Sequence, residues 1–198
     1  MKTYYLKFNG KHPAESKDNR NPLDKPPDVG DYGVAYSQEY LKVDIDDYNH
    51  KTGELEFPIR GKPRSDVVIA ILDALKIKYN CILTEKGKHL FFRIPEQLKE
   101  SKNKSSRWLC PLGIKMEWKF PTSDDHIPLR INGVERKFLK GSIDNEDVDE
   151  LPYFLYPLQM DNASFKVEFP EGDRTQHLGG YLFYLVGKKQ NRLLRLSD

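Results

Sequence analysis

Cysteine is scarce in this chain of 198 residues, which contains Cys81 and Cys110 and no others. The two form no C-x-x-C pair and no cluster with histidine. This pattern argues against a disulfide framework and against a structural zinc site. It fits a reducing compartment, and we expect the protein to be cytoplasmic.

The sequence also lacks a long hydrophobic run and an excess of charge of one sign. Its longest late apolar run, YLFYLV at 181–186, is far shorter than the roughly 20 residues that span a bilayer. The net charge is +2, from 32 basic and 30 acidic residues, so attraction for nucleic acid must come from local clusters of charge. We therefore expect no membrane contact, and overall charge identifies no partner.

The composition, 38% hydrophobic, 31% charged and 12% aromatic, is that of a folded α/β or α+β protein with a charged surface. We expect one main domain over 1–150, followed by a helical extension or linker over 151–198. The tail from 175 to 196 has a helical pattern with a basic end, interrupted by two glycines. No internal repeat is found.

Alternating and helical patterns predict the order of the elements. Strands are expected at 3–8, at two short runs within 33–46 that meet at a polar turn, around a tight turn at Gly87, at 114–120, and on both sides of Asn132-Gly133. A core-facing helix is expected from an N-cap at Ser65 towards Tyr79, and a Lys/Ser-rich linker at 98–107. These elements predict an α+β fold with a mixed, largely antiparallel central sheet and flanking helices.

Two carboxylates at the end of one predicted strand form the first candidate site. In KVDID, Val43 and Ile45 face a core, while Asp44 and Asp46 share the opposite face. Such a pair can reach one divalent ion, because Mg²⁺ prefers hard oxygen ligands and because two like charges disfavour each other without a cation. The alternative is a solvated strand end that runs into an acidic turn.

The segment TEKGKH suggests a second candidate site. Lys86, Gly87 and Lys88 precede His89, so a tight turn would bring backbone N–H groups, two ammonium groups and an imidazole together. This combination suits a triphosphate, although the G-x-x-x-x-G-K-[ST] phosphate loop is absent. A histidine that only packs or forms a hydrogen bond is the alternative.

Glu117, in KMEWK, offers a third carboxylate on a polar strand face. With Asp44 and Asp46 it would complete a two-metal cluster that activates a 3′-hydroxyl and stabilises leaving pyrophosphate. Alternatively, Glu117 forms a surface ion pair with Lys115 or Lys119.

The ordered set KVDIDDYN, TEKGKHLFFR and GIKMEWKF resembles the three motifs of the archaeo-eukaryotic primase superfamily, in particular the primase-polymerase domains of phage and plasmid replication proteins. The resemblance covers roughly 33–138. It implies a primase-like fold in which Asp44, Asp46 and Glu117 are catalytic residues and ligands of Mg²⁺ or Mn²⁺. It likewise implies that His89 contacts the incoming nucleotide, flanked by Thr84, Lys86 and Lys88.

The resemblance implies a DNA primase or DNA-directed polymerase that uses a single-stranded DNA template and dNTP or NTP. The segments LPYFLYPL and EGDRTQHLGGYLFYL resemble the connection of such domains to a replicative helicase, which is a further expected partner. Spread cations are candidate template contacts, with a solvated basic loop as the alternative; they are Arg60, Lys62, Arg64, Lys102, Lys104 and Arg107.

Two other functions remain open. Glu117-Trp118-Lys119 is also an E-x-K sequence of the kind found in metal-dependent nucleases, which need one upstream aspartate on a neighbouring strand. A non-catalytic replication or DNA-binding module is the third hypothesis.

Overall fold

The computed structural model describes residues 1–99, 105–120 and 126–157. They belong to a compact unit that spans Met1–Gln159. Leu151 and Leu155 are buried in its core, so the chain still contributes to this unit beyond residue 150. The expected helix at 175–196, Lys102 and Lys104 lie outside the described residues.

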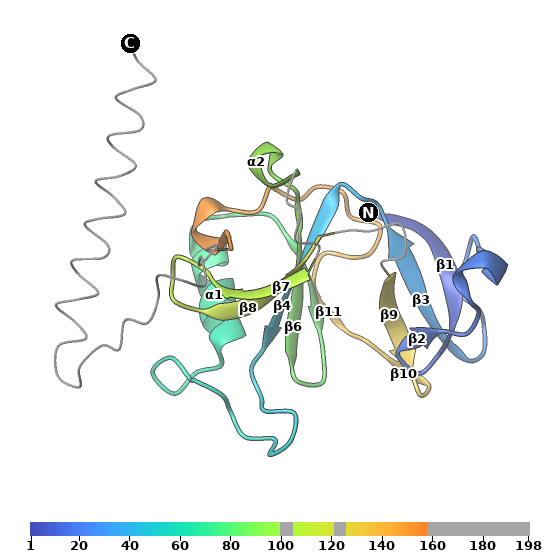
Figure 1. Ribbon diagram of the computed structural model, residues 1–198, viewed down its shortest axis with the longest axis horizontal. Helices are drawn as coiled ribbons and strands as arrows, with labels where there is room; N and C mark the ends of the chain where they lie inside the picture. Colours follow the sequence, from blue (N-terminus) through green and yellow to red (C-terminus); the bar gives the residue numbers. More distant parts are fainter. Residues whose placement is uncertain (100–104, 121–125, 158–198) are drawn as a thin grey trace, which may run out of the picture. The chain divides into compact units, whose positions relative to one another are not determined.

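The described chain folds into two sheets and a few short helices (Figure 1). Sheet A has the strand order β10-β9-β3-β1-β2, and sheet B the order β11-β5-β6-β4-β8-β7. The strands of sheet A are β1 (Lys2–Asn9), β2 (His12–Pro13), β3 (Asp31–Tyr36), β9 (His126–Ile131) and β10 (Val134–Glu135). Those of sheet B are β4 (Tyr40–Asp46), β5 (Asn80–Leu83), β6 (Gly87–Arg93), β7 (Ser105–Leu109), β8 (Lys115–Lys119) and β11 (Phe138–Lys140). The helices are α1 (Arg64–Ala74), α2 (Glu96–Lys99), η1 (Lys17–Asn19) and η2 (Tyr153–Leu155).

The α+β class is confirmed, but the single central sheet is wrong. Every ladder between the named strands of the described ranges is antiparallel, and one isolated parallel bridge joins Arg93 and Glu150. The two strands expected to meet within 33–46 are β3 and β4, which lie in different sheets. Alternation shows which face of a strand is buried, but it does not identify the neighbouring strands. The expected linker at 98–107 is also partly strand, because β7 begins at Ser105.

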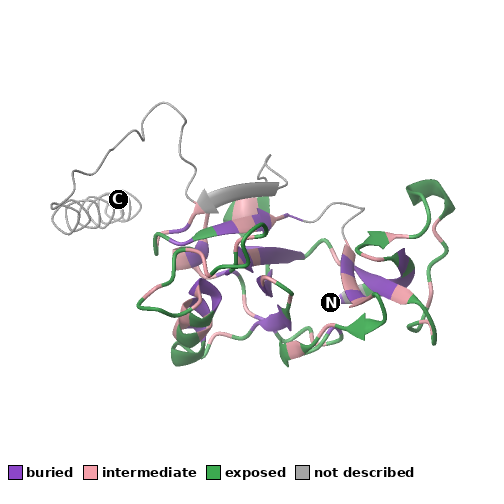
Figure 2. Cartoon of the chain, turned by 90° about the horizontal axis from the view of Figure 1, so that it is seen from below, coloured by how far each residue is buried: buried purple, intermediate pink, exposed green. Residues whose placement is uncertain are grey.

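Each face of sheet B has its own core. Val43 and Ile45 on one face pack with Val68 and Leu72 of α1, and all four side chains are fully buried. On the other face, one end of sheet B packs against sheet A in a second cluster, which includes Tyr40 of β4. Figure 2 shows this burial along the strands of both sheets. Asp44 and Asp46 lie on the second face, beyond the end covered by sheet A.

Helix α1 begins differently from the sequence prediction. Pro63 is at the N-cap, and Ser65 lies inside the first turn. The Ser65 backbone N–H donates to Asp47 Oδ1 over 2.9 Å, and its hydroxyl donates to Asp47 Oδ2. Asp47 therefore supplies the helix start with an acceptor from outside the helix, as a capping side chain does.

Two glycines that were expected in turns have different roles. Asn132 and Gly133 have φ of 50° and 76°, as the predicted two-residue hairpin turn between β9 and β10 requires. Gly87 does not have positive φ; it begins β6 opposite Asp46. A Cβ at Gly87 would overlap the backbone carbonyl oxygen of Ile45, so glycine is needed for close approach of two strands rather than for a turn.

Candidate functional site

The strand register brings the predicted acids and the histidine together on one face of sheet B. Asp44 of β4 lies opposite His89 of β6 and also opposite Glu117 of β8. Directly paired residues project from the same face of a sheet, and so do residues two apart on one strand. Asp44, Asp46, His89 and Glu117 therefore share a face, although they come from three separate segments of the sequence.

Asp44 and His89 form a close, largely buried pair. His89 Nε2 is 3.1 Å from Asp44 Oδ2, and the two side chains are 10% and 14% exposed. Burial lowers the pKa of His89, which favours the neutral imidazole, and Asp44 opposes that shift. Burial raises the pKa of Asp44, but the hydrogen bond from His89 and the nearby Lys42 and Lys119 outweigh it, so this pKa is held below its usual value. The carboxylate is thus kept charged.

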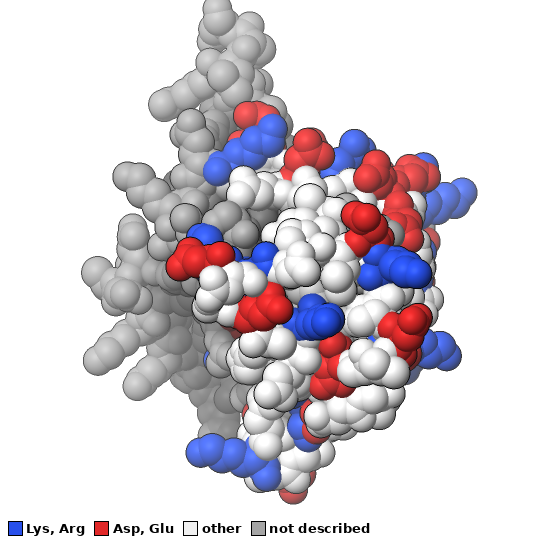
Figure 3. Space-filling model, turned by 90° about the vertical axis from the view of Figure 1, so that its right-hand side faces the viewer, with Lys and Arg blue, Asp and Glu red and all other residues white. Residues whose placement is uncertain are grey.

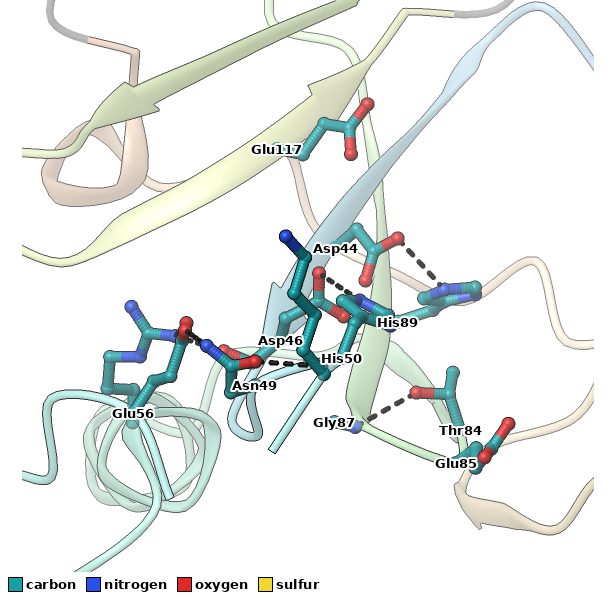
Figure 4. A network of polar contacts seen from close by, with 12 residues as sticks. Asp44, Asp46, Asn49, His50, Glu56, Thr84, Glu85, Gly87, His89 and Glu117 are labelled. Atoms are coloured by element: carbon teal, nitrogen blue, oxygen red, sulfur yellow. Dashed lines mark hydrogen bonds and ion pairs between the residues drawn. The ribbon is translucent and has the colours of Figure 1, made fainter. Parts of the chain in front are cut away.

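The other two acids have separate partners, and Figure 4 shows the contact between Asp46 and His50. Asp46 Oδ2 is 3.3 Å from Nε2 of His50, and Glu117 Oε1 is 3.6 Å from Nζ of Lys119. Among the residues that the structure describes, no group of three His, Cys, Asp or Glu side chains is close enough to hold a metal ion. Divalent-ion binding by the three acids therefore requires them to change partners.

One feature of the site favours a cation. Asp44 Oδ1 is buried and has no hydrogen-bond partner within the described part of the chain. A buried carboxylate oxygen without a donor is costly. The three acids offer only hard oxygen donors, which suit Mg²⁺ or Mn²⁺. The donor set therefore fits the expected ion in chemistry.

Two adjoining cavities open at Asp44 and Asp46. The first, of about 340 Å³, lies between the two sheets. Its lining is rich in cationic and imidazole groups, namely Lys11, His12, Lys42, His50, Lys86, His89, Lys119, His126 and Arg136. The second, of about 460 Å³, is more acidic and is lined by Glu56 and Glu117, with Phe57, Lys51 and Lys115. We call them the cationic cleft and the acidic cleft.

The residues expected to contact a nucleotide are divided between the two faces of sheet B. Lys86 and Thr84 line the cationic cleft with His89. The Thr84 hydroxyl accepts the Gly87 N–H over 3.0 Å, which occupies one donor of the turn. Lys88, by contrast, precedes His89 on β6, so its side chain lies on the opposite face of sheet B, towards α1.

Lys88 is a structural residue in this fold. Its Nζ is 2.6 Å from both Ser65 Oγ and Asp66 Oδ1, and 3.9 Å from Asp47 Oδ2. It is 9% exposed. The expectation that Lys88 joins His89 at a phosphate is therefore not supported by its position: one residue along a strand reverses the face.

The residues expected to contact the template differ in exposure. Arg60 and Lys62 are exposed, whereas Arg64 is buried at 6% exposure, donates to the backbone oxygen of Asp46 and lies 3.9 Å from Glu56. Arg64 therefore supports the site and is not a surface contact. The backbone of Arg107 pairs with Glu117 across β7 and β8. On the molecular face shown in Figure 3, acidic and basic side chains are interspersed.

Sequence reasoning missed several residues of the clefts. His50 follows the acidic strand in a loop and lines both cavities. Lys42 precedes Asp44 by two residues, so the alternation of β4 could have identified it. His126 and Arg136 come from beyond the third motif, and no local pattern connects them to β4.

Comparison with known proteins gives no relative. No protein-family model matches the chain, and searches of curated proteins and of solved structures find no match. Within 1–99, 105–120 and 126–157, no helix has the length and hydrophobicity needed to cross a membrane.

Proposed function

We propose that this protein is a template-directed nucleotidyltransferase, a DNA primase or DNA-directed polymerase of archaeo-eukaryotic primase-like fold. The observation that carries the proposal is the register of β4: Asp44 is paired with His89 on one side and with Glu117 on the other, with Asp46 on the same face. Three motifs far apart in sequence thus meet at one site. The acids that could hold a divalent ion also lie beside a cleft rich in cations, and phosphoryl transfer uses both kinds of group.

The three acids would hold Mg²⁺ or Mn²⁺. When bound, such ions would lower the pKa of the strand's 3′-hydroxyl and neutralise the charge on the leaving pyrophosphate. Asp44 is kept ionised by its surroundings and has a buried oxygen without a hydrogen bond, whereas Asp46 and Glu117 would have to leave His50 and Lys119 to hold the ion.

The cationic cleft would hold the triphosphate of the incoming dNTP or NTP. Lys86 and Arg136 line it, and His89 lies at its boundary with the acids. The volume of about 340 Å³ is within the range of small-ligand sites. Lys88 has no part in this cleft. Single-stranded DNA is the proposed template, and a replicative helicase domain the proposed partner.

The test is incorporation of labelled nucleotides on single-stranded DNA, with and without an annealed primer, in Mg²⁺ or Mn²⁺ and with dNTP and NTP in parallel. Asp46→Asn is the matched inactive variant, because the Asp46 side chain is 36% exposed and its removal leaves the buried Asp44–His89 pair intact. Product from the wild type alone supports a polymerase, and product without primer a primase. No product in any condition refutes the proposal.

A second candidate function, metal-dependent nuclease, is favoured by one observation. Asp44 lies directly opposite Glu117, and Lys119 is 3.6 Å from that acid on the same strand. This provides the upstream aspartate that an E-x-K site needs. A nuclease gives no role to His89 or to the cationic cleft, so cleavage of the DNA in the same reactions, unaffected by His89→Gln, would favour it over the polymerase.

A further inference from the structure

Phe57 is an exposed aromatic side chain at the edge of the acidic cleft. Its exposure is 74%, and it lines this cavity together with Asp44, Asp46 and Glu117. Leaving a phenyl ring in water forgoes its hydrophobic stabilisation. The proposed reaction assigns it no role.

The backbone holds Phe57 in a conformation that is unfavourable for a bulky residue. Its φ is 46°, in the left-handed region, and Pro58 follows it. Non-glycine residues in this region cost free energy and persist where the surrounding structure imposes them. Nothing in the burial of the ring compensates for this cost.

Contacts of the preceding residue and of the ring hold Phe57 in this position. The preceding residue, Glu56, donates its backbone N–H to Asp47 O over 2.7 Å and accepts from the Asn49 side chain over 2.6 Å. On the other side, the Arg64 guanidinium lies 5.7 Å from the ring centroid, a cation–π contact. Phe57 is therefore held in place at the base of the loop, and one side of its ring is supported by a cation.

The charges around the ring are mixed, because the acidic cleft holds four carboxylates and also several cations. Lys51 and Lys115 line the same cavity, and the exposed Arg60 and Lys62 lie a few residues further along the loop. Aromatic side chains interspersed with cations bind single-stranded nucleic acid by stacking on bases while the cations contact phosphates. A purely apolar partner would have no use for these cations.

We propose that Phe57 is a stacking platform for an unpaired base of a single-stranded nucleic acid at the acidic cleft. This inference rests on the proposed function for the identity of the strand, because the ring would orient the base next to the phosphate that reacts at Asp44, Asp46 and Glu117. Phe57 binds and orients the base, and it takes no part in the chemical step.

The test is binding of a labelled single-stranded DNA oligonucleotide in Mg²⁺ without nucleotides, measured by fluorescence anisotropy. Phe57→Ala is expected to weaken binding about tenfold, the effect of losing one base–aromatic stack. Phe57→Trp keeps a ring and should bind at least as tightly as the wild type. On an abasic oligonucleotide with the same phosphates, wild type and Phe57→Ala should bind equally.

The matched control is Tyr153→Ala. Tyr153 is 66% exposed, and η2 lies on the other face of sheet B, where the indole N–H of Trp118 donates to Leu155 O. This variant should bind DNA like the wild type. Equal binding by Phe57→Ala and wild type, or equal loss on normal and abasic strands, overturns the stacking role. The binding assay measures no turnover, so its result is independent of the incorporation assay. If base binding depends on Phe57 but the incorporation assay gives no product, the proposed polymerase is refuted and the stacking role stands.

Discussion

Asp46 and Asp47 are adjacent in sequence, yet their carboxylates serve opposite faces of sheet B. Asp46 Oδ2 lies 3.3 Å from His50 at the clefts, whereas Asp47 Oδ1 accepts the backbone N–H of Ser65 over 2.9 Å beneath α1. The Asp46 side chain is 36% exposed and that of Asp47 is 2% exposed. One acid is available to a ligand, and the other is fully committed to the fold.

We predict that changing each of these aspartates to asparagine affects stability and activity in opposite ways. Asp47→Asn removes the charged acceptor of Ser65 and leaves Lys88 without a nearby buried carboxylate, so it should lower the free energy of unfolding by about 2–4 kcal/mol. Asp46→Asn should change stability by less than about 1 kcal/mol and abolish nucleotide incorporation. Urea denaturation followed by circular dichroism, beside the incorporation assay, measures both. Equal stability of the two variants would contradict the assignment.

Lys86 and Lys88 should also differ. Lys86 lines the cationic cleft, whereas Lys88 contacts Ser65 and Asp66 on the α1 face. Lys86→Met should therefore raise the KM for nucleoside triphosphate several-fold and leave the unfolding midpoint unchanged. Lys88→Met should lower stability by about 1–3 kcal/mol, with KM unchanged in the folded fraction. A KM effect confined to Lys88→Met would reverse the two roles.

Thiol chemistry provides a test of the core. Burial raises the pKa of Cys81 from 9.0 to about 12, and burial also raises the pKa of Cys110. At pH 9 the Cys81 thiol should react with a disulfide reagent at least about a hundredfold more slowly than in the urea-unfolded chain, because the thiolate is the reactive form, and Cys110 should also react more slowly than when unfolded. The folded pKa of Cys81 is raised, so its contribution to stability is present below pH 9 and is lost as the pH rises towards 12. A fast-reacting thiol in the native protein would show that one of the two sites is open.

Local sequence patterns place the three acids and His89 on one face of their strands, but they do not predict how the strands pair into sheets. Alternation in KVDID fixes the face of Asp44 and Asp46, and the same rule places His89 and Glu117 once the strands pair. Pairing itself depends on long-range contacts that alternation does not encode. Only three residues separate β3 from β4, and for this reason the two strands were expected to pair. They lie in two different sheets.

The errors at single residues have the same origin. Lys88 was grouped with His89 because the two are adjacent, but adjacency on a strand means opposite faces. Serine is a residue type that favours the N-cap, but Ser65 lies inside the first turn, and Asp47, 18 residues earlier, supplies the acceptor at that helix start. Glycine is a common turn residue, but Gly87 is needed because a Cβ there would overlap the backbone of Ile45 on the neighbouring strand. In each case a residue far away in sequence decides the role.

Arg136 is the residue of the cationic cleft whose contribution can be tested most directly. It lies just beyond β10, and its Nη1 is buried with no hydrogen-bond partner in the described ranges. Burial lowers the pKa of this guanidinium, and Asp44 and Glu85 oppose the shift. Even with that shift the group is cationic at neutral pH, so it is a charged donor held in the cleft, which a phosphate oxygen would satisfy.

Arg136→Met should therefore weaken binding of nucleoside triphosphate about tenfold, the effect of losing one charge-assisted hydrogen bond. Arg130→Met is the matched control, because Arg130 donates to the backbone oxygens of Pro27 and Gly30 and lies outside the residues that line the cleft. Calorimetric titration with a non-hydrolysable triphosphate in Mg²⁺ measures binding without turnover. If Arg136→Met binds like the wild type, the cationic cleft holds the triphosphate without Arg136; if Arg130→Met weakens binding equally, the effect comes from sheet A as a whole and not from a contact with phosphate.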